Sequence, residues 1–274
     1  MITEFDTFKE KLEDLTLNYS DKIEMPLFTT FENKFSDGAN AFEGYQRGWG
    51  LEYSHSSEHF SDVVEQIRND ELYNFALSAA ENLTVVSEER RMNIFLLLTK
   101  YIKNIEIGDW IEFGSYKGGN AIFLAIISKV IGFNNKIYAC DSFEGMPKTD
   151  KALDLHNEGD FSDSNFKFLS SYVSKLKLDN IHLVKGFFSE SLKRNDMSNL
   201  NFSFAHIDAD IYEACNESFM YVKDRMVNKG YLVFDDATVS SCIGATRFVE
   251  EQVIRKSGLN SEQIWPHFVF RISS

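Results

Sequence analysis

Acidic side chains stand at the ends of several short apolar segments of this chain, where they could act on a bound ligand. They are Glu112, Asp141, Asp208, Asp235 and Asp236. A strand that ends in carboxylates is costly to bury unless these groups bind something. Ligands of open α/β sheets gather at the carboxyl ends of parallel strands. The spacing therefore predicts a parallel sheet whose acidic tips converge on one ligand site.

A glycine-rich turn follows Glu112 and opens an apolar helix that begins near Asn120. Glycine lets the backbone turn tightly and approach a ligand closely. The Glu112 carboxylate would repel the pyrophosphate of a dinucleotide, but it would attract the ammonium of an amino-acid moiety. The turn therefore favours S-adenosylmethionine over NAD. Similar turns also occur in α/β folds that bind no ligand, so the turn alone does not decide the function.

Asp141 ends the second predicted strand, 136–141. In nucleotide-binding α/β folds, a carboxylate at this place accepts hydrogen bonds from ribose hydroxyls. The alternative is an Asp that opens an ordinary turn, because Gly145 and Pro147 follow it. We favour the ribose interpretation.

Three carboxylates at the last two parallel strand tips predict a cation site. Asp208 follows one strand, and Asp235 and Asp236 follow the next. All-oxygen ligation suits Mg²⁺, with Ca²⁺ or Mn²⁺ as alternatives, better than zinc. Helix or turn capping is the competing interpretation for Asp210 and Asp236, and we favour it for Asp210.

Four segments together resemble the macrocin O-methyltransferase family, which methylates macrolide sugars. They are 112–119, 141–147, 208–213 and 230–236, and the resemblance extends from about Thr84 to the C-terminus. It implies an α/β, Rossmann-like class I methyltransferase fold with a mostly parallel seven-stranded sheet and an antiparallel last strand. It divides the chain into an N-terminal helical extension, 1–83, and a methyltransferase domain, 84–274. It also implies S-adenosylmethionine, Mg²⁺ and a sugar hydroxyl as acceptor.

The resemblance assigns binding roles by position. Thr84, Glu112, Gly114, Ser115 and Asn120 would hold the methionine end, Asp141 the ribose, Ser142 and Phe143 the adenosine side, and Gly186 and Phe187 the adenine. Ala209 replaces a glycine that is common in macrolide enzymes, and the segment before Thr84 has no aligned counterpart. These departures leave the acceptor sugar open.

Methyl transfer to oxygen needs an activated hydroxyl. A coordinated metal would lower the pKa of the acceptor and fix its position, and joint binding of donor and acceptor supplies proximity. Asp208 and His267 are the candidate bases. His206 shares a strand face with Asp208 by two-residue alternation and is a candidate supporting partner.

Two other functions use the same residues. A phenol or catechol acceptor would suit the same carboxylates. A non-catalytic S-adenosylmethionine-binding protein is disfavoured, because clustered carboxylates destabilise a fold that holds no cation to neutralise them.

Outside these motifs, helices are predicted over 3–18, 60–80 and 88–102, and from about Tyr212 to Asn228. The aromatic run 42–49 would line an acceptor pocket, form a dimer contact or pack internally. The acidic segment 151–163 is either a lid or a surface loop. His55 and His59 have metal-binding spacing but no evident third ligand.

The amino-acid composition limits which binding partners and which cellular compartment we expect for this protein. The net charge is −14, from 28 basic and 42 acidic residues, which argues against nucleic acid or an anionic membrane as partner. Three widely spaced cysteines give no disulfide framework and suit a reducing cytoplasm. The sequence shows neither a signal peptide nor a membrane span. We expect a cytoplasmic enzyme with a glycosylated small-molecule acceptor, and the family resemblance suggests a homo-oligomer.

Overall fold

A seven-stranded β-sheet forms the centre of the molecule in the computed structural model, which describes residues 3–23, 61–133 and 135–272. The strand order is β3-β2-β1-β4-β5-β7-β6. The strands are β1 (Asp109–Phe113), β2 (Ile137–Asp141), β3 (Ile181–Lys185), β4 (Phe202–Ile207), β5 (Met226–Phe234), β6 (Ser261–Gln263) and β7 (Phe268–Ile272). The first five strands are parallel to one another, and β7 is antiparallel to β5. This topology confirms the predicted Rossmann-like α/β fold with an antiparallel last strand.

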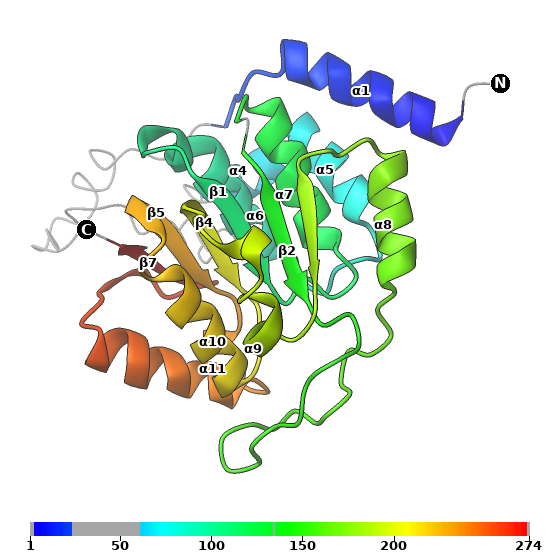
Figure 1. The fold of residues 1–274 in the computed structure, drawn as a ribbon. Helices are drawn as coiled ribbons and strands as arrows, with labels where there is room; N and C mark the ends of the chain where they lie inside the picture. The colour runs from blue at the N-terminus through cyan, green and yellow to red at the C-terminus, as the bar shows by residue number, and fades with distance from the viewer. Residues whose placement is uncertain (1–2, 24–60, 134, 273–274) are drawn as a thin grey trace, which may run out of the picture.

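Helices cover both faces of the sheet (Figure 1). The first hydrophobic core joins the sheet to the helices α1 (Glu4–Asn18), α4 (Ser61–Arg68), α5 (Glu71–Ala80), α6 (Glu88–Leu96), α7 (Gly119–Val130) and α8 (Phe166–Lys175). The second core contains residues of α10 (Tyr212–Val222) and α11 (Ile243–Phe248), and the short helix α9 (Phe188–Ser191) packs against it. In the described part of the chain, no helix is both long enough and apolar enough to span a membrane.

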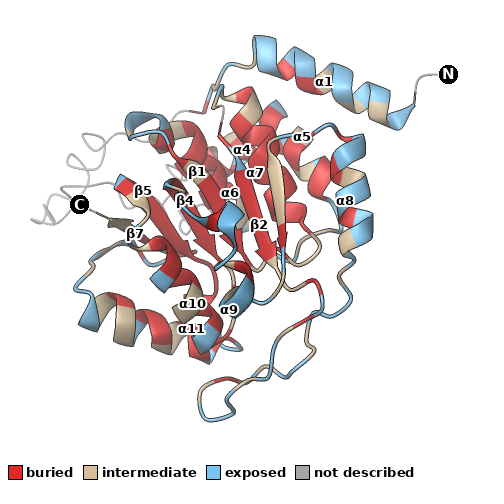
Figure 2. Ribbon diagram, in the orientation of Figure 1, coloured by how far each residue is buried: buried red, intermediate tan, exposed pale blue. Residues whose placement is uncertain are grey.

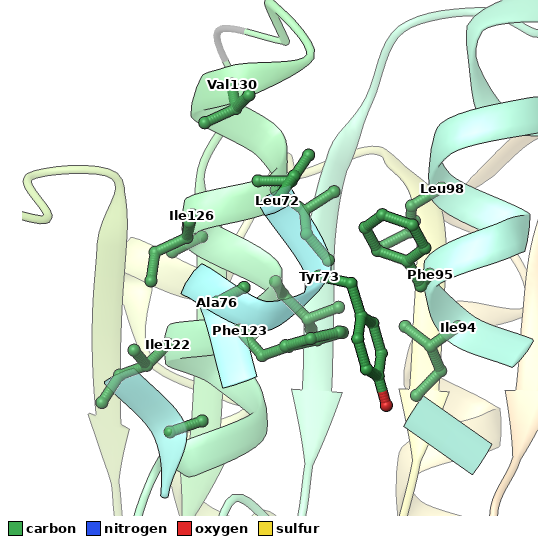
Figure 3. Close-up of a cluster of buried hydrophobic side chains, with 14 of the residues drawn as sticks. Leu72, Tyr73, Ala76, Ile94, Phe95, Leu98, Ile122, Phe123, Ile126 and Val130 are labelled. Carbon is green, nitrogen blue, oxygen red and sulfur yellow. The ribbon is translucent and has the colours of Figure 1, made fainter. Parts of the chain in front are cut away.

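Helix α7 is the most deeply buried helix next to the site. Its residues from Gly119 to Ser128 are all buried, because the helix lies between the sheet and α5. Figure 3 shows Tyr73 of α5, Phe95 of α6 and Phe123 of α7 meeting in this layer. The Tyr73 ring lies edge-on to both phenylalanines, with centroid separations of 5.3 and 5.7 Å. A helix that is apolar on all sides needs such double coverage.

The described helices before residue 84 share the core of the sheet domain. Helix α1 begins with a capping box between Thr3 and Asp6, and it buries Leu12 and Leu15 in the core that contains α5 and α7. Its outer face is exposed, whereas the central strands β1, β2, β4 and β5 are largely buried (Figure 2). The described residues before 84 therefore contribute packing to the sheet domain.

Two predicted helix boundaries were wrong. The helix expected over 60–80 is broken before α5, where the Asp70 carboxylate caps the new helix by accepting hydrogen bonds from the Leu72 and Tyr73 N–H groups, each at 2.9 Å. The helix expected to reach Asn228 ends at Val222, because the chain from Met226 onward joins the sheet beside β4.

Two predicted features lie outside the described residues. They are the aromatic run 42–49 and the histidine pair His55 and His59.

Candidate active site

A cavity of about 590 Å³ opens at the carboxyl ends of the parallel strands. Four of the predicted acidic tips line it, namely Asp141, Asp208, Asp235 and Asp236, and so do the predicted residues Gly114, Ser142 and Phe187. The long connection from β2 to α8 passes beyond these strand ends (Figure 1) and contributes much of the remaining wall. The structure therefore brings four of the five predicted tips together at one cavity, whereas Glu112 does not line it.

Gly114 joins the tip of β1 to the tip of β4. It has a φ of +88°, and a Cβ atom at this position would lie 1.7 Å from the backbone oxygen of Asp208. The Asp208 N–H in turn donates to the Phe113 carbonyl oxygen at 2.9 Å. Only glycine fits this crossing, because any side chain would push the Asp208 backbone away.

Glu112 lies behind this turn, with 1% of its surface exposed. Its Oε1 accepts hydrogen bonds from Asn120 Nδ2 at 2.5 Å and from His206 Nδ1 at 3.2 Å. Three buried polar atoms beside it have no hydrogen-bond partner among the described residues: Glu112 Oε2, Asn120 Oδ1 and Ser115 Oγ. Buried polar atoms are rarely left unpaired. These two acceptors and the Ser115 hydroxyl, on and around the glycine turn, are suited to a cationic N–H donor.

Asp141 lies at the tip of β2, on the opposite side of the turn. Its carboxylate accepts hydrogen bonds from the Tyr116 N–H at 2.8 Å and the Phe143 N–H at 2.6 Å. Burial raises the pKa of Asp141, although both backbone hydrogen bonds oppose the change. The Ser142 hydroxyl donates to the Gly145 carbonyl oxygen at 2.7 Å, which holds the next turn closed. Asp141 is therefore fixed in orientation at the cavity wall.

The other residues predicted to bind S-adenosylmethionine differ in how deeply they are buried. Phe187 is 38% exposed and lines the cavity, and Gly186 before it has a φ of +134°. Phe143 is buried in the core against Phe166, with ring centroids 5.2 Å apart. Thr84 Oγ1 accepts a hydrogen bond from the Val86 N–H at 3.1 Å, in a segment that packs closely on Gly119 at the start of α7.

Asp235 is held by three cationic or polar partners. Its Oδ2 accepts a hydrogen bond from Arg90 Nη1 at 2.6 Å, and its Oδ1 lies 2.8 Å from His267 Nε2 and 3.3 Å from His206 Nε2. Burial alone would raise the pKa of Asp235, but the contacts with the two histidines outweigh it and lower that pKa. Asp235 is therefore ionised within its network.

The two histidines have different charge states. Burial opposes protonation of His206, but Asp235 and Glu112 at its two ring nitrogens raise its pKa to about 9. His206 thus links Glu112 to Asp235 as an imidazolium. Burial lowers the pKa of His267, whose Nδ1 lies 3.0 Å from Asn93 Nδ2. A neutral His267 donates its Nε2–H to Asp235, and it does not line the cavity.

Asp208 and Asp236 complete the acidic cluster. Burial and the neighbouring carboxylates raise the pKa of both groups well above the usual range. Oxygen atoms of Asp208, Asp235 and Asp236 all lie within 4.8 Å of one another. Three carboxylates that repel one another and share a cavity wall fit a hard divalent cation such as Mg²⁺.

The capping role favoured for Asp210 was wrong. Asp210 has a φ of +54°, and its carboxylate accepts a hydrogen bond from the Cys242 thiol at 3.1 Å. The first N–H of α10, that of Tyr212, donates instead to Asp154 Oδ1 at 2.9 Å. Asp154 belongs to a distant segment, so sequence proximity pointed to the wrong carboxylate.

The segment 151–163 packs on α10 and α11. A Cβ atom on Gly244 would lie 1.7 Å from Asp154 Oδ1, which shows how closely the segment approaches α11. At its far end, Asp163 binds the Tyr116 hydroxyl and the Lys117 ammonium, each at 2.6 Å. Both ends of this segment are thus tied to elements that carry the site, and part of it lines the cavity.

Sequence reasoning missed Arg90 and Asn93. Both lie on α6, far from the strand tips in sequence, and they pair with Asp235 and His267. No local motif marks them, because their role depends on the approach of α6 to the ends of β5 and β7.

Comparison with known proteins agrees with this fold. A curated 8-demethyl-8-(2,3-dimethoxy-alpha-L-rhamnosyl)-tetracenomycin-C 4'-O-methyltransferase from Streptomyces olivaceus is 22% identical over 169 residues, which cover 58% of this chain and 64% of that protein. The chain thus spans less than two thirds of the length of that relative.

Two solved structures share the fold. The O-methyltransferase NovP has a TM-score of 0.57 at 16% identity, over 70% of this chain and 84% of that one. The calicheamicin methyltransferase CalS11 has a TM-score of 0.59 at 15% identity, over 94% and 98% of the two chains. Residues 77–261, more than half of the chain, match the model of the macrocin-O-methyltransferase (TylF) family. The chain belongs to the macrocin O-methyltransferase family.

Proposed function

We propose that this protein is a metal-dependent O-methyltransferase that transfers a methyl group from S-adenosylmethionine to a hydroxyl of a sugar or glycosylated natural product. The family membership and the sugar methylation named in the tetracenomycin relative support the reaction class. The observation that carries the proposal is the set of unpaired buried atoms on and around the glycine turn, Glu112 Oε2, Asn120 Oδ1 and Ser115 Oγ.

These unpaired atoms would receive the methionine end of the donor. Glu112 Oε2 and Asn120 Oδ1 accept hydrogen bonds, and an α-ammonium group donates them. A charged donor on a buried carboxylate makes a strong, charge-assisted hydrogen bond. Asp141 would accept the ribose hydroxyls, and the exposed Phe187 ring would lie against the adenine.

The carboxylates Asp208, Asp235 and Asp236 would hold Mg²⁺. A bound Mg²⁺ lowers the pKa of a coordinated hydroxyl and holds its oxygen in place. Arg90, His206 and His267 fix the orientation of Asp235, since these groups already bind both of its oxygens. Because Arg90 offsets part of the negative charge, the three carboxylates also cost less to keep together.

Asp208 is the group that we assign as the base. It is partly exposed at the cavity, whereas Asp235 and Asp236 are buried. A carboxylate oxygen of Asp208, at the cavity wall, takes the proton of the acceptor hydroxyl. The acceptor oxygen then bonds to the methyl carbon while the carbon–sulfur bond breaks, and S-adenosylhomocysteine leaves with the sulfur electron pair. His267 supports Asp235 from behind.

A panel of acceptors tests this proposal. The protein is incubated with S-adenosylmethionine and nucleotide sugars, glycosylated polyketides, catechols or phenols, and methylated products are detected by mass spectrometry. We expect methylation of a glycosylated acceptor that stops with chelator and returns with Mg²⁺. Asp208→Asn should lose this activity, and Asp179→Asn, at an 84% exposed side chain, should keep it. Activity that persists in chelator would refute the metal role, and methylation of catechols alone would refute the sugar acceptor.

A further inference from the structure

A second cluster of potential ligands lies beside the acidic cluster. It consists of His156, Asp210 and Cys242, which come from three distant parts of the chain. Cys242 Sγ lies 3.1 Å from Asp210 Oδ1 and 3.5 Å from His156 Nε2, and the latter two atoms are 3.7 Å apart. The Cys242 side chain is buried, and the other two are partly buried. Imidazole, carboxylate and thiol groups therefore face one another in a protected position.

The imidazole of His156 is held from its other side. His156 Nδ1 lies 3.3 Å from Asp160 Oδ2, and Asp160 Oδ2 also accepts a hydrogen bond from the Asn157 N–H at 2.9 Å. Histidine ligands of metals usually donate their free ring N–H to a carboxylate in this way. With Nδ1–H directed at Asp160, the Nε2 lone pair faces Asp210 and Cys242.

A carboxylate oxygen, an imidazole lone pair and a sulfur atom converge here. The Cys242 thiol donates its single proton to Asp210, so the Nε2 lone pair of His156 receives no proton from either group.

We propose that His156, Asp210 and Cys242 bind a divalent transition-metal ion of the zinc type. Thiolate, imidazole and carboxylate are the ligands that Zn²⁺ takes in proteins, and thiolate disfavours Mg²⁺. Zinc–ligand distances imply tetrahedron edges of about 3.3–3.8 Å, and the three observed separations of 3.1–3.7 Å are close to this range. Three protein ligands leave the fourth position to water.

Metal binding at this site would release the proton of the Cys242 thiol. Burial and the carboxylates of Asp236 and Asp210 raise the pKa of the Cys242 thiol, so the thiol keeps its proton without metal. Metal binding forms the sulfur–metal bond and releases the S–H proton to solvent. The ion would tie the segment 151–163 to the tip of β4 and to the start of α11, at the wall of the cavity. This site is independent of the proposed methyl transfer.

Titration of the reduced, chelator-treated full-length protein with Co²⁺ alone tests the proposal. Cobalt replaces zinc in such sites, and a cobalt–thiolate bond gives a near-ultraviolet charge-transfer band. We expect this band with one proton released per bound thiol. Cys242→Ala should abolish the band, and Cys215→Ala, a matched buried cysteine, should keep it. Asp208→Asn should also keep it, which separates this site from the all-oxygen cluster.

Two further variants keep the test decisive should Cys242→Ala fail to fold, as judged by circular dichroism. His156→Gln should weaken Co²⁺ binding at least tenfold, and Asp160→Asn should weaken it about 10–100-fold through the lost support of the ring. Absence of the band in the parent protein, or its full retention in folded Cys242→Ala, would overturn the proposal and leave the three groups as hydrogen-bonding partners.

Discussion

Asp235 and Asp208 lie in one cluster, yet removing the charge of each should change the melting temperature of the chelator-treated protein in opposite directions. Asp235→Asn removes the negative partner of Arg90, which lies 2.6 Å away, and Asp235 is only 2% exposed against 16% for Arg90. Breaking a buried pair from one side costs about 3–5 kcal/mol, because the other charge stays buried. At about 2–4 °C per kcal/mol for a chain of this size, the melting temperature should fall by about 6–20 °C.

Asp208→Asn should raise the melting temperature in the same buffer. Burial raises the pKa of Asp208 first, and Asp235 and Asp236 raise it further by repulsion, so removing this charge relieves both penalties. Among the described residues, Asp208 has no cationic partner, whereas Asp235 contacts the Arg90 guanidinium and the His206 imidazolium.

The pH dependence of the metal-free protein follows from the same shifts. Because Asp208 and Asp236 have raised pKa values in the folded state, these two groups bind more protons in the folded than in the unfolded chain above about pH 4. Their contribution to stability therefore falls as the pH rises from there toward the folded-state pKa values. Asp208→Asn should flatten this decline.

Calorimetric melting of the parent, Asp235→Asn and Asp208→Asn in chelator checks both directions. Asp179→Asn, on an exposed side chain, serves as the control. A melting temperature for Asp235→Asn within about 3 °C of the parent, or an equal loss in both cluster variants, would refute the assignment of Asp235 as the paired carboxylate and Asp208 as the strained one.

Two glycine substitutions test the backbone contacts of the site. Gly114→Ala should destabilise the chain more than Gly159→Ala. Both glycines have a positive φ, which costs an L-residue about 1–2 kcal/mol. Only at Gly114 would the added Cβ also press on a backbone oxygen. Denaturant unfolding measures the difference, and equal losses would contradict the crossing at Gly114. Gly244→Ala should displace Asp154 from α11 and speed limited proteolysis within 151–163, and an unchanged cleavage rate would show that this contact does not hold the segment.

The strand tips could be predicted from the sequence because their signal is local. Glu112 and Asp141 each interrupt or end an apolar strand segment next to turn-forming residues. Strands that end in carboxylates identify both the fold class and the edge of the sheet where a ligand binds.

The partners of these carboxylates could not be predicted in the same way. Arg90 reaches Asp235 across 145 positions, and His156 and Cys242 meet across 86. Such pairs leave no periodic pattern, because their contact depends on how α6 and the segment 151–163 pack against the strand ends. The capping of α10 by Asp154, 58 positions away from Tyr212, was missed for the same reason.

Calorimetric titration with S-adenosylmethionine tests the proposed methyl-donor site most directly. We expect saturable binding to the parent protein. Binding should be about 10–100-fold weaker for Glu112→Gln, which loses a charge-assisted hydrogen bond of about 1.5–3 kcal/mol. Glu144→Gln, at a 61% exposed side chain, should bind like the parent. Absence of binding to the folded parent, with or without Mg²⁺, would contradict the proposal that the unpaired atoms around Glu112 receive the methyl donor.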